Sequence, residues 1–253
     1  MTLRRLRRAV ALVLGVSGCL LKYAVARLRG PMTLEQRARW LQGTAQCVMA
    51  CLGIESRVEG QLPSQGLVVS NHLSYIDIVL IGSAMPCFFV SKKEVAGWPL
   101  FGWAARLGGT LFLDRSSHAS ANQVAKKMAD RLALPVPILL FPEGTSTDGA
   151  HVLKFRTRLI FPAAQIAAPI TAAAVSYRID GGQMLERELC WYGDETFANH
   201  LWKVLGVENF TGILRFGSPH IYTDGREAGL KTHAEVTALR GVGPVEMLAP
   251  QAS

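Results

Sequence analysis

The stretch L-V-V-S-N-H-L-S-Y-I-D, residues 67–77, decides how this chain is organised. Its first four residues are a short apolar run that predicts a buried strand, and a helical pattern follows from about 75 to 84. A buried strand followed by a helix is the repeating unit of an α/β fold with a parallel sheet. The polar residues between them fall at the carboxyl end of the strand, where open α/β sheets place their sites.

The same alternation of short apolar runs and helical stretches continues along the chain. Further strands are predicted at 87–91, 110–114, 136–141, 169–177, 188–192 and 212–217, and further helices at 97–107, 118–133, 156–167, 196–205 and 225–240. We therefore expect an α/β domain over residues 55–240, with a mostly parallel mixed sheet and helices on both faces. Residues 241–253 include two prolines and are predicted to be a disordered tail.

The first 54 residues have a different pattern, with two helices in succession. Residues 9–21 are an uninterrupted run of apolar and small residues, and a T-L-E-Q capping box at Thr33 opens a second helix through about Leu52. We expect residues 1–54 to form a two-helix membrane module. A helix lying in the inner leaflet fits best, a single span is the runner-up, and packing of both helices on the domain core is the alternative to membrane binding.

Positive charge is concentrated in the same segment. The net charge is +8, and residues 1–30 carry seven basic side chains and no acidic one. A nucleic-acid-binding protein would carry basic groups over its folded domain, so this pattern indicates an anionic lipid surface and no nucleic acid. We expect the protein at the cytoplasmic face of the cell inner membrane, either peripheral or monotopic or with a single N-terminal span.

The segment S-N-H-L-S-Y-I-D offers a histidine beside a carboxylate. His72 is suited to accept a proton near neutral pH, and a carboxylate on its other ring nitrogen would fix its tautomer. Asp77 lies five positions further on, which in a regular helix is about 140° out of phase. The pair can therefore meet only if His72 stands at or before the first turn, with Asn71 or Ser74 as the cap. Taken alone, this spacing also fits two structural residues at a helix start.

Two other segments carry residues suited to binding a polar group. In L-F-P-E-G-T-S-T-D-G, residues 140–149, Gly144 permits close approach of the backbone, and Thr145 with nearby N–H groups suits an anionic or hydroxyl-rich head group. In G-T-L-F-L-D-R, Arg115 at a strand end suits a phosphate, and Lys92 after another strand adds charge. An ordinary turn and solvated basic residues are the alternative interpretations.

The sequence lacks the motifs of several other chemistries. It contains no G-x-S-x-G elbow, no G-x-x-x-x-G-K-[ST], no strand-linked G-x-G-x-x-G and no H-E-x-x-H. The five cysteines are an odd number without a C-x-x-C pair, which argues against a disulfide framework and a zinc site. We therefore expect reduced thiols and no metal.

Together, these segments resemble the glycerolipid acyltransferase family typified by 1-acyl-sn-glycerol-3-phosphate acyltransferase. The resemblance covers roughly residues 55–180. The four motifs of that family are matched in order by His72 and Asp77, by Gly109, Phe112 and Arg115, by F-P-E-G-T at 141–145 in full, and loosely by A-P-I at 168–170.

The resemblance implies an O-acyltransferase that moves a fatty acyl group from acyl-CoA or acyl-ACP to a lysolipid hydroxyl, with no cofactor. The acceptor it implies first is 1-acyl-sn-glycerol-3-phosphate, giving phosphatidic acid. His72 would remove the hydroxyl proton and Asp77 would orient His72. Binding of the substrate would fall to Arg115, Lys92, Glu143, Gly144 and Thr145.

One departure from the family pattern concerns the acceptor. Many phosphatidic-acid-forming members have Arg after the Thr of the third motif, where this chain has Ser146. That variant, and the stretch at 191–202, resemble the branch of lyso-ornithine-lipid and lysophospholipid acyltransferases, so such a lysolipid is the alternative acceptor. A thioesterase using water, and a non-catalytic lipid-binding membrane protein, are the rival functions.

Overall fold

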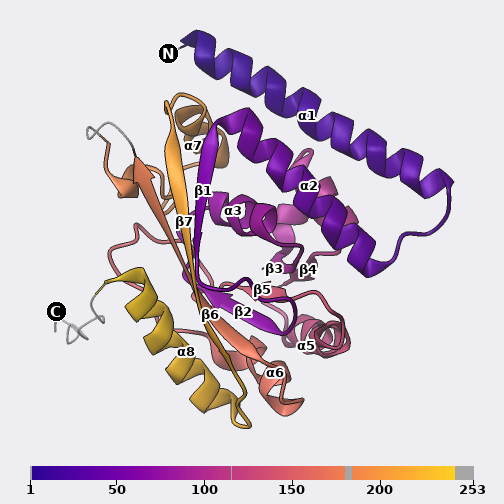
Figure 1. Cartoon of the computed structure of the whole chain (residues 1–253), viewed down its shortest axis with the longest axis vertical. Helices are drawn as coiled ribbons and strands as arrows, with labels where there is room; N and C mark the ends of the chain where they lie inside the picture. The colour runs from indigo at the N-terminus through magenta and orange to yellow at the C-terminus, as the bar shows by residue number, and fades with distance from the viewer. Residues whose placement is uncertain (1, 115, 180–183, 243–253) are drawn as a thin grey trace.

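The computed structural model describes residues 2–114, 116–179 and 184–242. Within these ranges one seven-stranded sheet has the order β1-β7-β6-β2-β5-β3-β4 (Figure 1). Of its neighbouring pairs, only β6 and β7 run antiparallel, so the expected mostly parallel mixed sheet is confirmed. The strands are β1 (Ile54–Glu59), β2 (Leu67–Ser70), β3 (Phe88–Lys92), β4 (Leu111–Leu113), β5 (Ile138–Leu140), β6 (Ile170–Ile179) and β7 (Phe210–His220).

Helices cover both faces of the sheet, as expected. Figure 1 shows α2 and α3 on one side of it and α8 on the other. In the central strand β2, Val68 packs in the core cluster with α2 and α3, whereas Leu67 and Val69 pack with α5 and α8. The helices are α1 (Thr2–Leu28), α2 (Leu34–Leu52), α3 (Ile76–Ala84), α4 (Phe101–Gly108), α5 (His118–Leu132), α6 (Phe161–Gln165), α7 (Phe197–Val204) and α8 (Gly225–Arg240), with short 3₁₀ turns η1 (Lys93–Gly97), η2 (Thr157–Leu159) and η3 (Glu186–Glu188).

The structure corrects the predicted sheet at two places. No strand forms at 188–192, where η3 leads into a loop. Leu189 and Cys190 are buried because this loop packs on the core, so their apolar character does not reflect strand pairing. Conversely, β1 has no apolar run, and only its first residue, Ile54, is buried. As an edge strand paired with β7 alone, β1 needs little apolar surface.

The two N-terminal helices have different surroundings. By length and composition, α1 is the one helix in the described ranges that is apolar enough to cross a membrane. Helix α2 begins with the predicted capping box between Thr33 and Gln36. However, α2 packs on α3 and α4, and its Val48 and Leu52 lie in the main core. Protein thus covers the apolar face of α2, so of the two helices expected in the membrane module only α1 remains a candidate for membrane contact.

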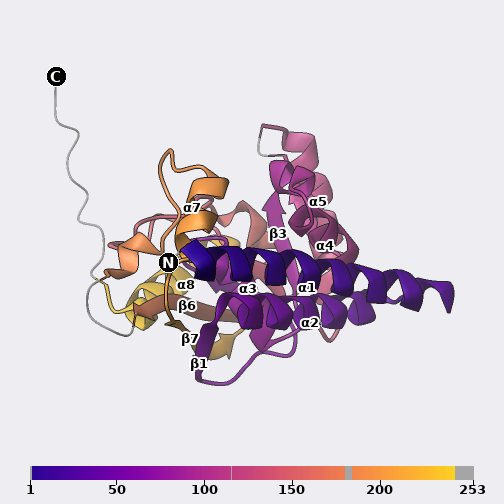
Figure 2. The ribbon, with the colours of Figure 1, turned by 90° about the horizontal axis from the view of Figure 1, so that it is seen from above.

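Helix α1 lies alongside α2 and is fixed to the domain over much of its length (Figures 1 and 2). The buried Arg8 donates to the main-chain oxygens of Val207 and Glu208, and the Trp40 indole donates to Cys19 O at 3.0 Å. Part of the basic N-terminal cluster thus binds protein and not lipid. The other face of α1 exposes an apolar row of Leu3, Leu6, Val10, Val13, Leu14, Leu21, Val25 and Leu28.

The predicted tail lies, from residue 243 onward, outside the described residues. Helix α8 ends at Gly241, whose left-handed conformation (φ 73°) closes the helix in the way that favours glycine.

Candidate active site

The turn between β2 and α3 brings His72 and Asp77 together. His72 Nδ1 lies 2.8 Å from Asp77 Oδ2, and the same oxygen accepts the main-chain N–H groups of Leu73 (2.7 Å) and Ser74 (3.0 Å). Asp77 is fully buried in the first turn of α3, whereas the His72 side chain keeps 19% of its surface exposed. The pair meets because His72 precedes the helix, as the five-residue spacing requires.

The strand β6 holds the start of this turn through Asn71. The Asn71 amide donates to Val175 O at 3.1 Å and accepts from Val175 N at 2.8 Å, as a neighbouring strand would. Asn71 therefore does not cap α3, whereas the Ser74 hydroxyl accepts from the main-chain N–H of Ile76, the first residue of α3, at 3.4 Å. The N-cap residue is Tyr75, with no side-chain capping bond. The expected Asn71 cap is wrong because the Asn71 side chain pairs with β6, whereas Ser74 binds the helix start from one position before the N-cap.

Glu143, in the F-P-E-G-T segment, binds the main chain of the histidine. One carboxylate oxygen accepts from His72 N at 2.7 Å and the other from Leu153 N at 2.8 Å. Glu143 is 3% exposed, and this burial raises the pKa of its carboxyl to about 7. His72 O in turn accepts from Thr147 N at 3.0 Å. Both main-chain groups of His72 are thus held by the segment 141–147.

The neighbours of Glu143 shape the surface beside the His72 ring. Phe141 stacks on that ring, with the centroids 4.2 Å apart. Gly144 adopts φ 79°, a conformation that disfavours other residues, and a Cβ there would lie 3.2 Å from Arg156 Nε. Thr145 is exposed and, like Gly144, lines the cavity in front of His72.

That cavity has a volume of about 610 Å³ and a mixed charge. Its wall includes the predicted residue Lys92, but Arg115 lies outside the described residues. Sequence reasoning missed two acidic residues of the wall, Glu94 and Asp114. Asp114 pairs with Lys93 at 3.4 Å. In the described ranges Glu94 forms no ion pair. No sequence signal marks these acids, because Glu94 comes from η1 after β3 and Asp114 from the separate segment after β4.

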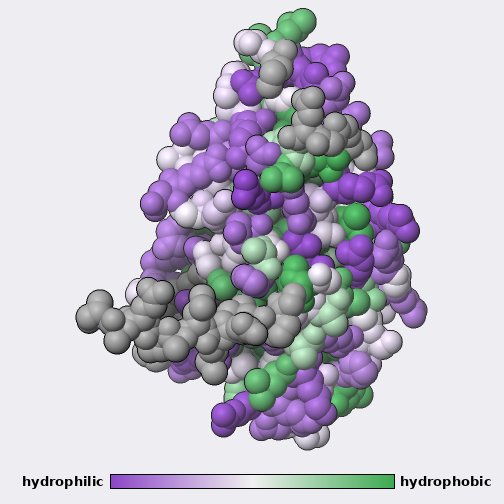
Figure 3. Space-filling model, turned by 90° about the vertical axis from the view of Figure 1, so that its left-hand side faces the viewer, coloured by the Kyte–Doolittle hydropathy of each residue, from purple (hydrophilic) through white to green (hydrophobic). Residues whose placement is uncertain are grey.

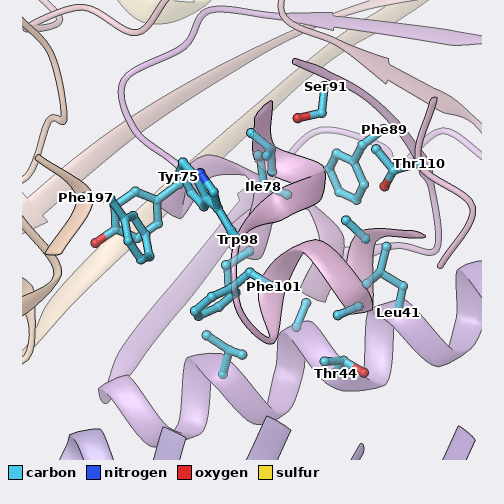
Figure 4. A pocket seen from close by; sticks show the side chains of 16 residues that line it. Leu41, Thr44, Tyr75, Ile78, Phe89, Ser91, Trp98, Phe101, Thr110 and Phe197 are labelled. Atoms are coloured by element: carbon cyan, nitrogen blue, oxygen red, sulfur yellow. The ribbon is translucent and has the colours of Figure 1, made fainter. Parts of the chain in front are cut away.

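An apolar cavity of about 100 Å³ adjoins the first and reaches between α2, α3 and α4. Figure 4 shows Tyr75, Trp98 and Phe197 grouped at one end, with Phe89 and Leu41 further along. The two cavities share the wall residues Tyr75, Ile78, Ser91, Val95 and Trp98. The apolar cavity therefore lies directly beside the His72 cavity.

A third, basic hollow of about 170 Å³ lies on the other side of Phe141. Arg156 and Arg158 line it, and it shares Val90, Ser91, Phe141 and Gly144 with the His72 cavity. Arg158 donates to Asn122 at 3.0 Å. Among its described lining residues there is no acid.

Ser146, the residue that departs from the family pattern, has an internal partner. Its hydroxyl donates to Trp191 O. Trp191 N donates to Leu73 O at 2.8 Å, so the loop that carries Trp191 is fixed to the His72 turn. The fourth predicted motif lies away from this region. Pro169 O accepts from Leu67 N at 2.9 Å, at the opposite end of β2 from His72.

Sequence comparisons agree with these features. Residues 54–176 match the family model described as "Acyltransferase". The lyso-ornithine lipid O-acyltransferase of Pseudomonas aeruginosa is 35% identical over 77% of this chain and 72% of its own length. That of Rhodobacter capsulatus is 37% identical over 79% and 74%. A 1-acyl-sn-glycerol-3-phosphate acyltransferase from Neisseria meningitidis serogroup B is 27% identical over 70% of each chain.

A solved structure has the same fold. The crystal structure of the 1-acyl-sn-glycerophosphate (LPA) acyltransferase from Thermotoga maritima superposes with a TM-score of 0.70. The match covers 95% of this chain and 94% of that one, at 18% identity. Such a low identity establishes the architecture alone.

Proposed function

This chain belongs to the glycerolipid acyltransferase family, and we propose that it esterifies a zwitterionic lysolipid of the lyso-ornithine-lipid class with a fatty acyl group from an acyl thioester. It is an acyltransferase of the lysolipid type. The observation that carries the proposed mechanism is the His72 ring, which Asp77 holds at the wall of a polar cavity that shares wall residues with an apolar one.

The proposed chemistry uses His72 as general base. Because Asp77 occupies Nδ1, the other ring nitrogen, Nε2, accepts the proton of the acceptor hydroxyl as its oxygen attacks the thioester carbonyl. Asp77 stabilises the imidazolium that forms. Collapse of the tetrahedral intermediate breaks the carbon–sulfur bond, and the leaving thiolate takes the proton from His72. The products are an ester and a free thiol.

The apolar cavity is suited to the acyl chain. Its walls are side chains such as Val48, Phe89 and Phe101, which favour contact with hydrocarbon over water. Since this cavity shares Tyr75 and Ser91 with the His72 cavity, a chain bound there would place its thioester next to the cavity that His72 lines.

The mixed charge of the His72 cavity favours a zwitterionic head group. An ornithine head carries an ammonium group and a carboxylate, which Glu94 and Lys92 can pair with respectively. A phosphomonoester dianion would meet repulsion from Glu94, and at position 146 it would find a serine bonded to Trp191. The lyso-ornithine lipid relatives support the same choice.

A second candidate acceptor is 1-acyl-sn-glycerol-3-phosphate, which the sequence implies first. The Neisseria relative and Lys92 in the cavity wall favour it. Replacement of Glu94 distinguishes the two candidate acceptors. Loss of its carboxylate weakens binding of an ammonium group and favours binding of a phosphate.

The basic hollow is suited to the phosphates of the donor. Among the described residues, nothing pairs with the Arg156 guanidinium, and the hollow opens beside Gly144 next to the His72 cavity. Acyl-CoA and acyl carrier protein both carry phosphate at the end of the pantetheine arm opposite the thioester, so a donor whose thioester lies at His72 needs a basic site outside the cavity that His72 lines. We therefore propose that Arg156 binds this phosphate.

Helix α1 is suited to lie in the membrane interface. It is fixed to the domain over much of its length, so it cannot stand upright in a bilayer unless the whole domain turns with it. Its exposed apolar row instead faces away from the protein, with Arg7, Lys22 and Arg29 exposed beside it. The face in Figure 3, on the α8 side, is mostly hydrophilic where it is visible. We propose α1 as an interfacial anchor at the cytoplasmic face.

The test compares His72→Ala with the unchanged protein, using a labelled acyl-CoA and each lysolipid in mixed vesicles. We expect esterification by the unchanged protein, faster with lyso-ornithine lipid, and a loss of at least about a thousandfold in His72→Ala. The matched control is His220→Ala, an exposed histidine at the far end of β7. Near-normal turnover in His72→Ala would contradict the mechanism.

Two further readouts of this assay address the rival functions and the acceptor. Free fatty acid released equally with and without lysolipid would indicate a thioesterase, and lysolipid binding without turnover would indicate a non-catalytic protein. Glu94→Gln is expected to raise KM for lyso-ornithine lipid by about fivefold or more, and not for lysophosphatidic acid.

A further inference from the structure

A buried tyrosine on β6 contacts the aspartate of the His72 turn from outside that turn. The Tyr177 hydroxyl donates to Asp77 Oδ1, the oxygen that His72 does not use. Tyr177 is 5% exposed and lies 100 residues further along the chain. Among the described residues, each carboxylate oxygen of Asp77 therefore has donors, with Tyr177 on one side and His72, Leu73 and Ser74 on the other.

The surroundings of Tyr177 give its hydroxyl no other evident purpose. The ring lies in the main hydrophobic core, in an edge-on contact with Phe210 at 5.9 Å. A buried phenol oxygen is costly unless it has a hydrogen-bond partner, and phenylalanine would fill the same space without that requirement. Burial and the charge of Asp77 raise the pKa of Tyr177 well above its ordinary value, so the hydroxyl keeps its proton and acts as a donor.

The same strand holds both ends of the His72 turn. Val175 pairs with Asn71 at the start of the turn, and Tyr177, two residues further along β6, binds Asp77 at its end. β6 is also the hydrogen-bonded neighbour of β2, from which the turn emerges. A strand in the middle of the sheet thus fixes the orientation of the Asp77 carboxylate, and through it the orientation of the His72 ring.

We propose that Tyr177 is a positioning residue for acyl transfer, which holds the Asp77 carboxylate in the plane that orients the His72 ring. The inference rests on the proposed function, in which His72 is the base. Tyr177 borders neither cavity of the site, so its effect reaches the substrate only through Asp77 and His72.

The first experiment measures kcat and KM for Tyr177→Phe, with thermal unfolding as a check on folding. We expect kcat to fall by about tenfold or more, while KM for donor and lysolipid stays within about twofold, because the cavities are unchanged. Tyr222→Phe, a partly exposed tyrosine beyond β7, is the matched control and should keep normal kcat. A normal kcat in Tyr177→Phe would overturn the proposal. So would a tenfold rise in KM without a change in kcat.

The second experiment is a double-mutant cycle with Asp77→Asn. If Tyr177 acts through Asp77, Tyr177→Phe should change kcat less than about twofold in the Asp77→Asn background. Additive losses would overturn the proposal. Tyr177→Leu, which also removes the hydroxyl, is measured in parallel in case the Phe variant fails to fold, and is expected to show the same loss of kcat.

The outcomes separate this inference from the proposed function. Retained turnover in His72→Ala would remove the function itself. An inactive His72→Ala together with a normal Tyr177→Phe would overturn only the role of Tyr177.

Discussion

The Nδ1 atom of His72 lies 2.8 Å from Oδ2 of Asp77, and the same oxygen gathers two main-chain N–H groups of the intervening turn. Asp77 thereby does two things at once. It orients the histidine ring, and it satisfies two main-chain donors of the turn that precedes α3. The histidine is partly exposed and lines the cavity, whereas the aspartate is fully buried, so only the histidine of this pair can be reached from the cavity.

Replacement of this aspartate should abolish most of the activity. In Asp77→Asn, an amide replaces a carboxylate that has four hydrogen-bond partners. The histidine then loses both its fixed tautomer and its counter-charge. We expect kcat to fall about a thousandfold, with little change in KM. The measurement is steady-state acyl transfer, with Asp148→Asn in an exposed turn as control. A loss of less than about tenfold would exclude Asp77 from the proposed role.

The unfolding free energy should depend on pH through Glu143. Burial raises the pKa of this carboxyl from 4.5 to about 7, so the folded protein keeps a proton that the unfolded chain releases. The stabilisation is therefore fully present below pH 4.5 and lost as pH rises to about 7. Glu143→Gln cannot titrate, so the stability of the protein relative to the variant should decline over this window, by on the order of 3 kcal/mol.

Denaturant unfolding at a series of pH values measures this difference. Glu55→Gln, on the exposed edge strand β1, controls for the loss of one carboxylate. A difference between the protein and Glu143→Gln that is constant from pH 4.5 to 7 would contradict the assigned ionisation.

Removal of Arg156 should affect the donor and not the acceptor. In Arg156→Ala we expect KM for acyl-CoA to rise about fivefold or more, because a charge-assisted hydrogen bond to phosphate is lost. KM for an acyl-N-acetylcysteamine thioester, which lacks phosphate, should change less than about twofold. Arg226→Ala, at the exposed start of α8, is the control. An effect confined to the KM of the lysolipid would instead assign Arg156 to the acceptor.

Acidic residues on the outer face of α1 should release the protein from membranes. Leu14 and Leu21 are 67% and 66% exposed, and the double variant Leu14→Glu/Leu21→Glu puts two charges into the apolar row. We expect at least about a tenfold loss of binding to anionic vesicles in a sedimentation assay. Ile221→Glu/Leu230→Glu, at similarly exposed positions near the start of α8, is the control. Equal binding by both double variants would show that α1 is not the anchor.

Much of the sheet could be predicted because its central strands are buried on both faces. β2 and β5 are continuous apolar runs, and the helices between strands carry their own period. The edge strand β1 could not be predicted in this way because it is mostly exposed and has no apolar run. The loop at 188–192 resembles a strand because its apolar residues are buried in the core.

The sequence by itself determined the α/β class, the apolar N-terminal helix and the family motifs around His72, Asp77 and Glu143, since periodicity and short-range spacing are local properties. Only the tertiary structure decided that α2 belongs to the domain, that Glu143 binds the histidine main chain, and that Tyr177 reaches Asp77. These contacts join residues 71 and 100 positions apart. Which side chains meet at such separations depends on strand order and register, and no local pattern in the chain encodes either.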